Sequence, residues 1–87
     1  MHNYRIYTIS TTDLRTNITD TKAYFRAKIA YNTFKIACEL HGYKISNVMY
    51  SEDDSLLIAQ AGGRPYYHLI QFSEHTLLRP YDACTEL

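Results

Sequence analysis

The chain has no tryptophan and only three glycines, two prolines and two cysteines. So little glycine and proline excludes collagen-like and low-complexity classes. No apolar run approaches the roughly 18 residues of a membrane-spanning helix, and the N-terminus lacks the apolar segment of a signal peptide. The two cysteines, Cys38 and Cys84, fit neither a disulfide framework nor metal-ligand spacing, so we expect free thiols. Together these absences predict a cytoplasmic protein without a membrane partner.

The chain is long enough for one domain and one core. Its 87 residues predict a single domain over residues 1–87, with a tail that frays from about residue 80. The formal net charge is zero, but residues 1–50 carry seven basic and three acidic side chains, and residues 51–87 carry two basic and six acidic ones. This split of +4 against −4 either steers docking onto a charged partner or balances within the fold.

Residues 21–41 carry the only long helical pattern in the chain. Their apolar residues recur at helical spacing on two adjoining arcs that cover more than half of the circumference. Small residues lie at the centre of this apolar side, which suits a helix packed on a sheet. We therefore expect Ala30, Phe34 and Ala37 to be buried against that sheet.

The ends of this helix carry matching signals. Thr19 or Asp20 is a suitable N-cap, and Gly42 supplies a left-handed residue just after the last turn. One flank of the helix belongs either to the core or to a partner surface, and it consists of Phe25, Ile29, Ile36 and Leu40.

Four segments alternate with the period of a β-strand, namely residues 3–10, 43–50, 56–60 and 66–72. Turn-forming residues separate the last three, at 51–54 and 61–65. Residues 11–20 read as a loop, with room for a short extended piece. Either residues 73–76 begin a short helix that ends before Pro80, or residues 75–81 form an extended segment along the sheet edge. The sequence thus predicts an α+β domain of order β-α-β-β-β, with one helix on one face of a mainly antiparallel sheet.

No motif for catalysis, metal or cofactor binding stands out. Cys38 and His41 share a helix face, but this is the predicted core face, where an inert thiol is expected. The four histidines and two cysteines lack the repeated short spacing of zinc ligands. Gly62-Gly63 suits a hairpin turn better than a phosphate-binding loop, because no helix is predicted after it. We therefore name no catalytic residue, no metal ligand and no cofactor.

Tyrosine is the compositional outlier, with nine residues. Neighbouring strand positions point to opposite faces, so a helix on one face leaves some tyrosines exposed or covered by a partner. Exposed tyrosine is common in protein interfaces, where charged residues form the rim. We therefore predict a small non-enzymatic protein-binding module, monomeric or homodimeric. Its predicted contact residues are Tyr7, Tyr50 and Tyr67, with Arg5, Arg64, Glu52, Asp53 and Asp54 as the charged rim.

Two other classes of function remain open. Tyrosines on a sheet can stack on bases, which makes a small nucleic-acid-binding or regulatory domain the alternative, although zero net charge weakens phosphate binding. A small enzyme or enzyme subunit ranks last, because no nucleophile and base can be paired in so short a chain.

The strand at residues 4–9, the helix at residues 22–40 and the hairpin that begins near Tyr43 also occur in this order in other small proteins. In size and element order, residues 4–60 resemble several small phage-encoded type I anti-CRISPR proteins. The resemblance implies an inhibitor from a phage or mobile element that occupies a surface on a larger bacterial defence complex. It also implies a location in the cytoplasm of the host cell.

Overall fold

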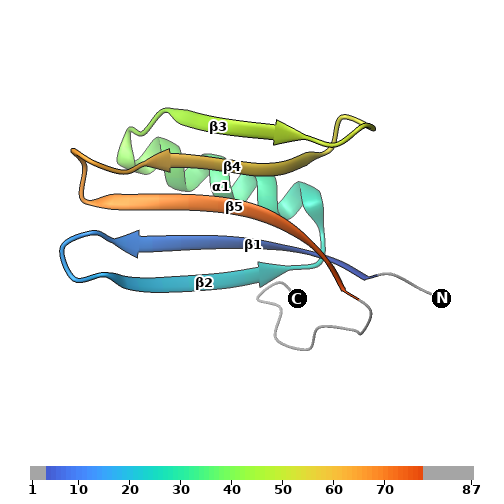
Figure 1. Cartoon of the computed structure of the whole chain (residues 1–87), viewed down its shortest axis with the longest axis horizontal. Coiled ribbons are helices and arrows are strands. Elements are labelled where there is room, and N and C mark those ends of the chain that lie inside the picture. Colours follow the sequence, from blue (N-terminus) through green and yellow to red (C-terminus); the bar gives the residue numbers. More distant parts are fainter. Residues whose placement is uncertain (1–3, 78–87) are drawn as a thin grey trace.

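The computed structural model describes residues 4–77 as one antiparallel sheet with one helix behind it (Figure 1). The five strands lie in the order β2-β1-β5-β4-β3, so β2 and β3 form the two edges. The elements in chain order are β1 (Tyr4–Asp13), β2 (Ile18–Tyr24), α1 (Ala27–His41), β3 (Ile45–Tyr50), β4 (Leu56–Gly62) and β5 (His68–Leu77). This arrangement confirms the predicted α+β class, with a single helix on one face of an antiparallel sheet.

The prediction for residues 11–24 is wrong. Only residues 14–17 form a turn and no first helical turn is present, because β1 continues to Asp13 and the turn leads into an additional strand, β2. Thr19 and Asp20 lie inside β2 and cap nothing, and α1 begins only at Ala27 after the extended Arg26. The threonines of β2 favour a strand, and their hydroxyls pair across to β1, as in Thr12–Thr19 at 2.8 Å.

The last strand is longer than predicted. Residues 73–76 continue β5, where they pair with β1 instead of beginning a helix or following the sheet edge. β5 is the middle strand and pairs with β1 over ten residues, from Tyr4 opposite Leu77 to Asp13 opposite His68. The expected fraying from about residue 80, and Cys84, fall outside the described residues.

The core lies between α1 and the middle of the sheet. Phe34 is 1% exposed and Phe72 is fully buried, and their ring centroids lie 5.9 Å apart. On β4 the small residues Ala59 and Ala61 complete this layer and let the helix approach. The predicted burial of Ala30 and Phe34 is therefore confirmed, whereas the predicted burial of Ala37 is only partly confirmed, because it is half-buried.

The helix ends as the sequence predicts. Gly42 adopts the left-handed conformation, with a φ of 71°, and its N–H donates to the carbonyl of Glu39. Cys38 is buried, and this burial raises the pKa of its thiol. On the flank that the sequence left open, Ile36 and Leu40 are exposed, whereas Ile29 packs against the core.

Candidate protein-binding surface

The edge strand β3 is the most exposed apolar element of the fold. All six of its residues are exposed, and four of them are large and apolar, namely Ile45, Val48, Met49 and Tyr50. The pairing with β4 shifts register between Ser46 and Met49, and Asn47 takes a positive φ of 51° there. An extra residue of this kind bends a strand and redirects its side chains. An edge strand of a monomer normally carries charges instead.

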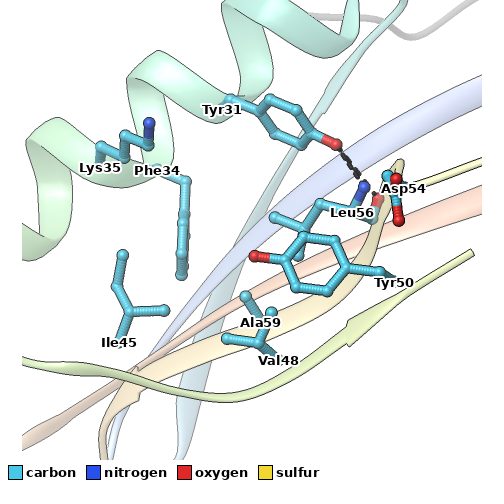
Figure 2. Close-up of a pocket in the computed structure, with 9 residues that line it drawn as sticks. All are labelled: Tyr31, Phe34, Lys35, Ile45, Val48, Tyr50, Asp54, Leu56 and Ala59. Atoms are coloured by element: carbon cyan, nitrogen blue, oxygen red, sulfur yellow. Dashed lines mark hydrogen bonds between the residues drawn. The ribbon is translucent and has the colours of Figure 1, made fainter.

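Behind β3, a cavity of about 200 Å³ opens between the helix and the sheet. Figure 2 shows α1 on one side of this space and β3 and β4 on the other. Its lining is mostly apolar and consists of Tyr31, Phe34, Ile45, Val48, Tyr50, Leu56 and Ala59, with Lys35 and Asp54 as the charged members. We call these nine residues the apolar corner.

The shape of the apolar corner is held by Tyr31. The N–H of Leu56 donates to the phenol oxygen of Tyr31 at 2.6 Å, and this phenol can donate to the carbonyl of Leu56 at 3.4 Å (Figure 2). The Tyr31 ring also lies 5.2 Å from that of Phe72, which ties it to the core. The helix is therefore fixed at the start of β4, and the cavity stays open beside this contact.

The turn between β3 and β4 carries the predicted acidic rim. Asp53 accepts hydrogen bonds from the hydroxyl of Ser51 and the N–H of Ser55. These bonds lower the pKa of Asp53 from 3.8 to about 2, so it stays ionised at neutral pH. On the far side of the turn, Arg5, Glu52 and Asp53 line a polar hollow together with Ser51 and Glu74. Arg5 there approaches Glu74 at 3.8 Å.

The predicted contact residues do not form one site. Tyr50, which is 62% exposed, ends β3 beside the acidic turn, and Asp54 lines the apolar corner with it. Tyr67, which is 60% exposed, directly precedes β5 and belongs with Arg64 to the turn after β4. β3 and β5 run in the same direction, so Tyr50 and Tyr67 lie at opposite ends of the sheet (Figure 1).

The placement of Tyr7 as an exposed contact residue is wrong. Tyr7 is 8% exposed and belongs to the core, with its ring centroid 6.0 Å from that of Phe72. Ile9 has the same parity on β1 and is also in the core. The sequence placed apolar groups on both faces of this strand, and only the position of the helix decides which face becomes the core.

The opposite end of the sheet is aromatic and basic. Arg15 lies over the ring of Tyr67, 4.8 Å from its centroid, and also forms a salt bridge of 3.3 Å with Asp13. This bridge lowers the pKa of Asp13 and raises that of Arg15. Four further rings follow one another nearby, with centroids 4.8 to 5.0 Å apart, in the order His68, His41, Tyr43 and Tyr66.

Sequence reasoning missed most of the apolar corner. It treated residues 43–50 as an ordinary strand and did not place them at an edge, because strand order is not visible in a sequence. The one available signal was Asn47, a residue type that tolerates positive φ, inside an otherwise regular strand. Without the resulting register shift, Ile45, Val48 and Tyr50 would not be expected on one side.

Residues 4–77 contain no group of three or more His, Cys, Asp or Glu side chains placed to hold a metal ion. Within the same residues, no helix is long and apolar enough to cross a membrane. Comparison with protein-family models, with curated proteins and with solved structures finds no match for this chain.

Proposed function

We propose that this domain is a small non-enzymatic module that binds a protein partner through the apolar corner. The observation that carries the proposal is the cavity of about 200 Å³ behind an edge strand with exposed large apolar residues. Contiguous exposed apolar surface is rare on monomers and typical of interaction sites. A partner side chain in the cavity would remove Val48 and Tyr50 from water together.

The chemistry of the corner defines the partner. An apolar or aromatic side chain fits the space beside Tyr31, Phe34 and Leu56, as an interface anchor does in a pocket. Lys35 and Asp54 supply one charge of each sign at the lining, and Glu52 and Asp53 extend the acidic side. We therefore expect a partner with an apolar anchor beside a basic group that faces the acidic turn.

A second candidate function rests on the other end of the sheet. The turns there bring Arg15 and Arg64 to the same end as the exposed Tyr66 and Tyr67, a combination that suits single-stranded nucleic acid. It ranks below protein binding because Asp13 pairs with Arg15 and the net charge of the chain is zero.

The finer form of the proposal follows the resemblance to small anti-CRISPR proteins. In that form the partner is a subunit of a bacterial defence complex, and the protein acts as a phage or mobile-element inhibitor in the host cytoplasm. Co-expression with a panel of type I defence complexes tests it. Loss of interference by one complex, restored by Tyr50→Ala, is the expected result, and undiminished interference by all of them would contradict it.

Two tyrosines with matched exposure test the contact surface. A tagged protein is captured from bacterial lysate with and without nuclease, the partner is identified, and its affinity is measured with purified components. Tyr50→Ala should weaken binding by roughly 1–3 kcal/mol, which is about 5–150-fold. Tyr67→Ala removes an equally exposed ring at the other end and should leave the affinity unchanged.

A photo-crosslinking residue locates the partner directly. Placed at Val48, it should crosslink the captured protein, whereas at Asn32 on the exposed side of α1 it should not. Crosslinking from position 32 alone would move the interface to the outer helix surface. Capture that disappears with nuclease, together with weaker binding by Tyr67→Ala, would favour the nucleic-acid function.

A further inference from the structure

The face of the sheet that points away from α1 has an unusual composition. Residues opposite one another on paired strands share a face, and successive residues alternate between faces. Tyr7 and Ile9 point toward the helix, so the register assigns the other positions to what we call the open face. Its members in the rows of Thr8, Ser10 and Thr12 are Thr8, Ser10, Thr12, Thr19, Thr21, Ala23, Ser46, Met49, Ile58, Gln60, Gly62, Leu69, Gln71 and Ser73. Ala23 in this set and Ile6 in the row before it are each only 4% exposed, so this end of the open face is already covered.

The open face contains no Asp, Glu, Lys or Arg within the described strands. All five charged residues of these strands have the opposite parity and lie on the helix side, namely Arg5, Asp13, Asp20, Lys22 and Glu74. Charged residues make up 21% of the chain. A sheet face that stays in water normally carries such residues, and their depletion marks the centre of an interface.

The polar groups of the open face can form hydrogen bonds with the same groups on a second copy of the chain. A hydroxyl or a primary amide both donates and accepts, whereas an ammonium group only donates and a carboxylate only accepts. Ser10 pairs with Thr21 at 2.9 Å, yet each hydroxyl keeps capacity for another bond. Gln60 and Gln71 stand opposite one another on β4 and β5. A second copy can therefore satisfy this face, and no like charges repel it.

The size of the face suits a weak dimer. Three rows of five strands, at about 4.8 Å between strands and about 6.7 Å between rows, give roughly 480 Å² per copy, or a little under about 1,000 Å² in total. Contacts of this size are typical of weak and transient complexes. The exposed apolar members, Ile58 and Met49, lie side by side on β4 and β3.

We propose that two copies of this chain pack open face to open face as a symmetric dimer. A partner with a different sequence would gain register and specificity from complementary charges, and the open face has none to offer it. The dimer leaves the apolar corner free, because the corner lies on the helix side. The proposal is thus independent of the proposed function.

A charge placed at the centre of the face tests the dimer. β5 is the middle strand and Gln71 lies in the middle of the three rows, so in a symmetric dimer Gln71 approaches its own copy. Sedimentation equilibrium over micromolar to millimolar concentrations should show a reversible dimer for the wild type. Gln71→Lys should raise the dissociation constant at least tenfold, whereas Asn32→Lys adds the same charge to the exposed helix surface and should not.

Charge complementation completes the test. A mixture of Gln71→Lys with Gln71→Glu should form a heterodimer although neither variant dimerises alone, and circular dichroism confirms that both are folded. A wild type that stays monomeric at millimolar concentration overturns the proposal, as does a dimer that Gln71→Lys leaves unchanged. A monomer whose Tyr50→Ala variant still loses its protein partner would overturn the dimer alone and keep the proposed function.

Discussion

The two faces of this sheet differ in more than the presence of the helix. The helix side holds the aromatic core around Phe72 and also every charged residue of the strands. The open face holds hydroxyls, two glutamines, His75 and a few apolar residues, of which Ile6 and Ala23 are buried. A sheet covered on one side only is expected to show the reverse, with its charges on the uncovered side.

The difference shows that coverage by the helix is incomplete. α1 contributes its buried residues to the middle of the sheet, so Lys22 and Asp20 on edge strand β2 remain exposed although they share the helix side. Near the opposite edge the apolar corner remains open instead. The helix side thus combines a core with a polar and an apolar margin, whereas the open face carries no Asp, Glu, Lys or Arg in any described strand.

Adjacent residues on β5 give the largest expected contrast between the faces. Phe72→Ala removes a fully buried ring and should lower the free energy of unfolding by about 3–5 kcal/mol. Gln71→Ala changes an exposed side chain on the other face and should cost about 0.5 kcal/mol or less. Urea unfolding at submicromolar protein concentration, where dimerisation is negligible, measures both. Similar costs for the two variants would contradict the assigned register.

Tyr7 and Tyr67 repeat the comparison between a buried and an exposed side chain, with a smaller expected difference in the free energy of unfolding. Tyr7→Ala should cost about 3 kcal/mol, because its ring is buried beside Phe72. Tyr67→Ala removes an exposed ring and its contact with Arg15, for a loss below about 1 kcal/mol. The melting temperatures of the two variants and of the wild type measure these losses. Equal melting temperatures would show that the Tyr7 ring is not buried.

Much of the fold follows from the sequence because its signals are local. The alternation in residues 3–10 and 43–50, the Gly42 helix end and the burial of Phe34 depend on neighbours along the chain. β2 was missed because Thr21–Tyr24 also fits the helical pattern of the residues that follow. Pairing with β1 makes these residues a strand and not part of the helix, and such long-range pairing cannot be predicted from local propensity.

The candidate surface could be predicted only in part for the same reason. The acidic turn at Glu52–Asp54 and the exposure of Tyr50 and Tyr67 follow from local pattern. The division of these residues between two ends of the sheet, and the cavity behind β3, depend on strand order and on the position of the helix. Neither can be read from one sequence.

The burial of Tyr7 on the helix side should also affect how the free energy of unfolding changes with pH in the alkaline range. Burial raises the pKa of Tyr7 above 10.0, and the nearby carboxylate of Glu74 adds to this. The folded protein therefore keeps a proton that the unfolded chain releases. The resulting stabilisation is complete below pH 10 and is lost as the pH rises through the raised pKa of Tyr7.

Urea unfolding at a series of pH values from 9 to 12 measures this loss. Tyr7→Phe has no phenol to titrate, so its stability should fall less steeply with pH than that of the wild type. Identical slopes for the two proteins would show that the burial of Tyr7 has no effect on its proton.

The smallest expected effect belongs to the hydroxyl pairs of the open face. Thr12 and Thr19 are hydrogen-bonded at 2.8 Å in an exposed setting, and a cross-strand pair of this kind contributes roughly 0.2–1 kcal/mol. Thr12→Val, Thr19→Val and the double variant form a thermodynamic cycle that isolates the coupling. A coupling of this size is too small to account for the many hydroxyls of the open face, which agrees with the proposed dimer. A coupling well above about 1 kcal/mol would instead make the hydroxyls structural, and the composition of the face would then need no second copy.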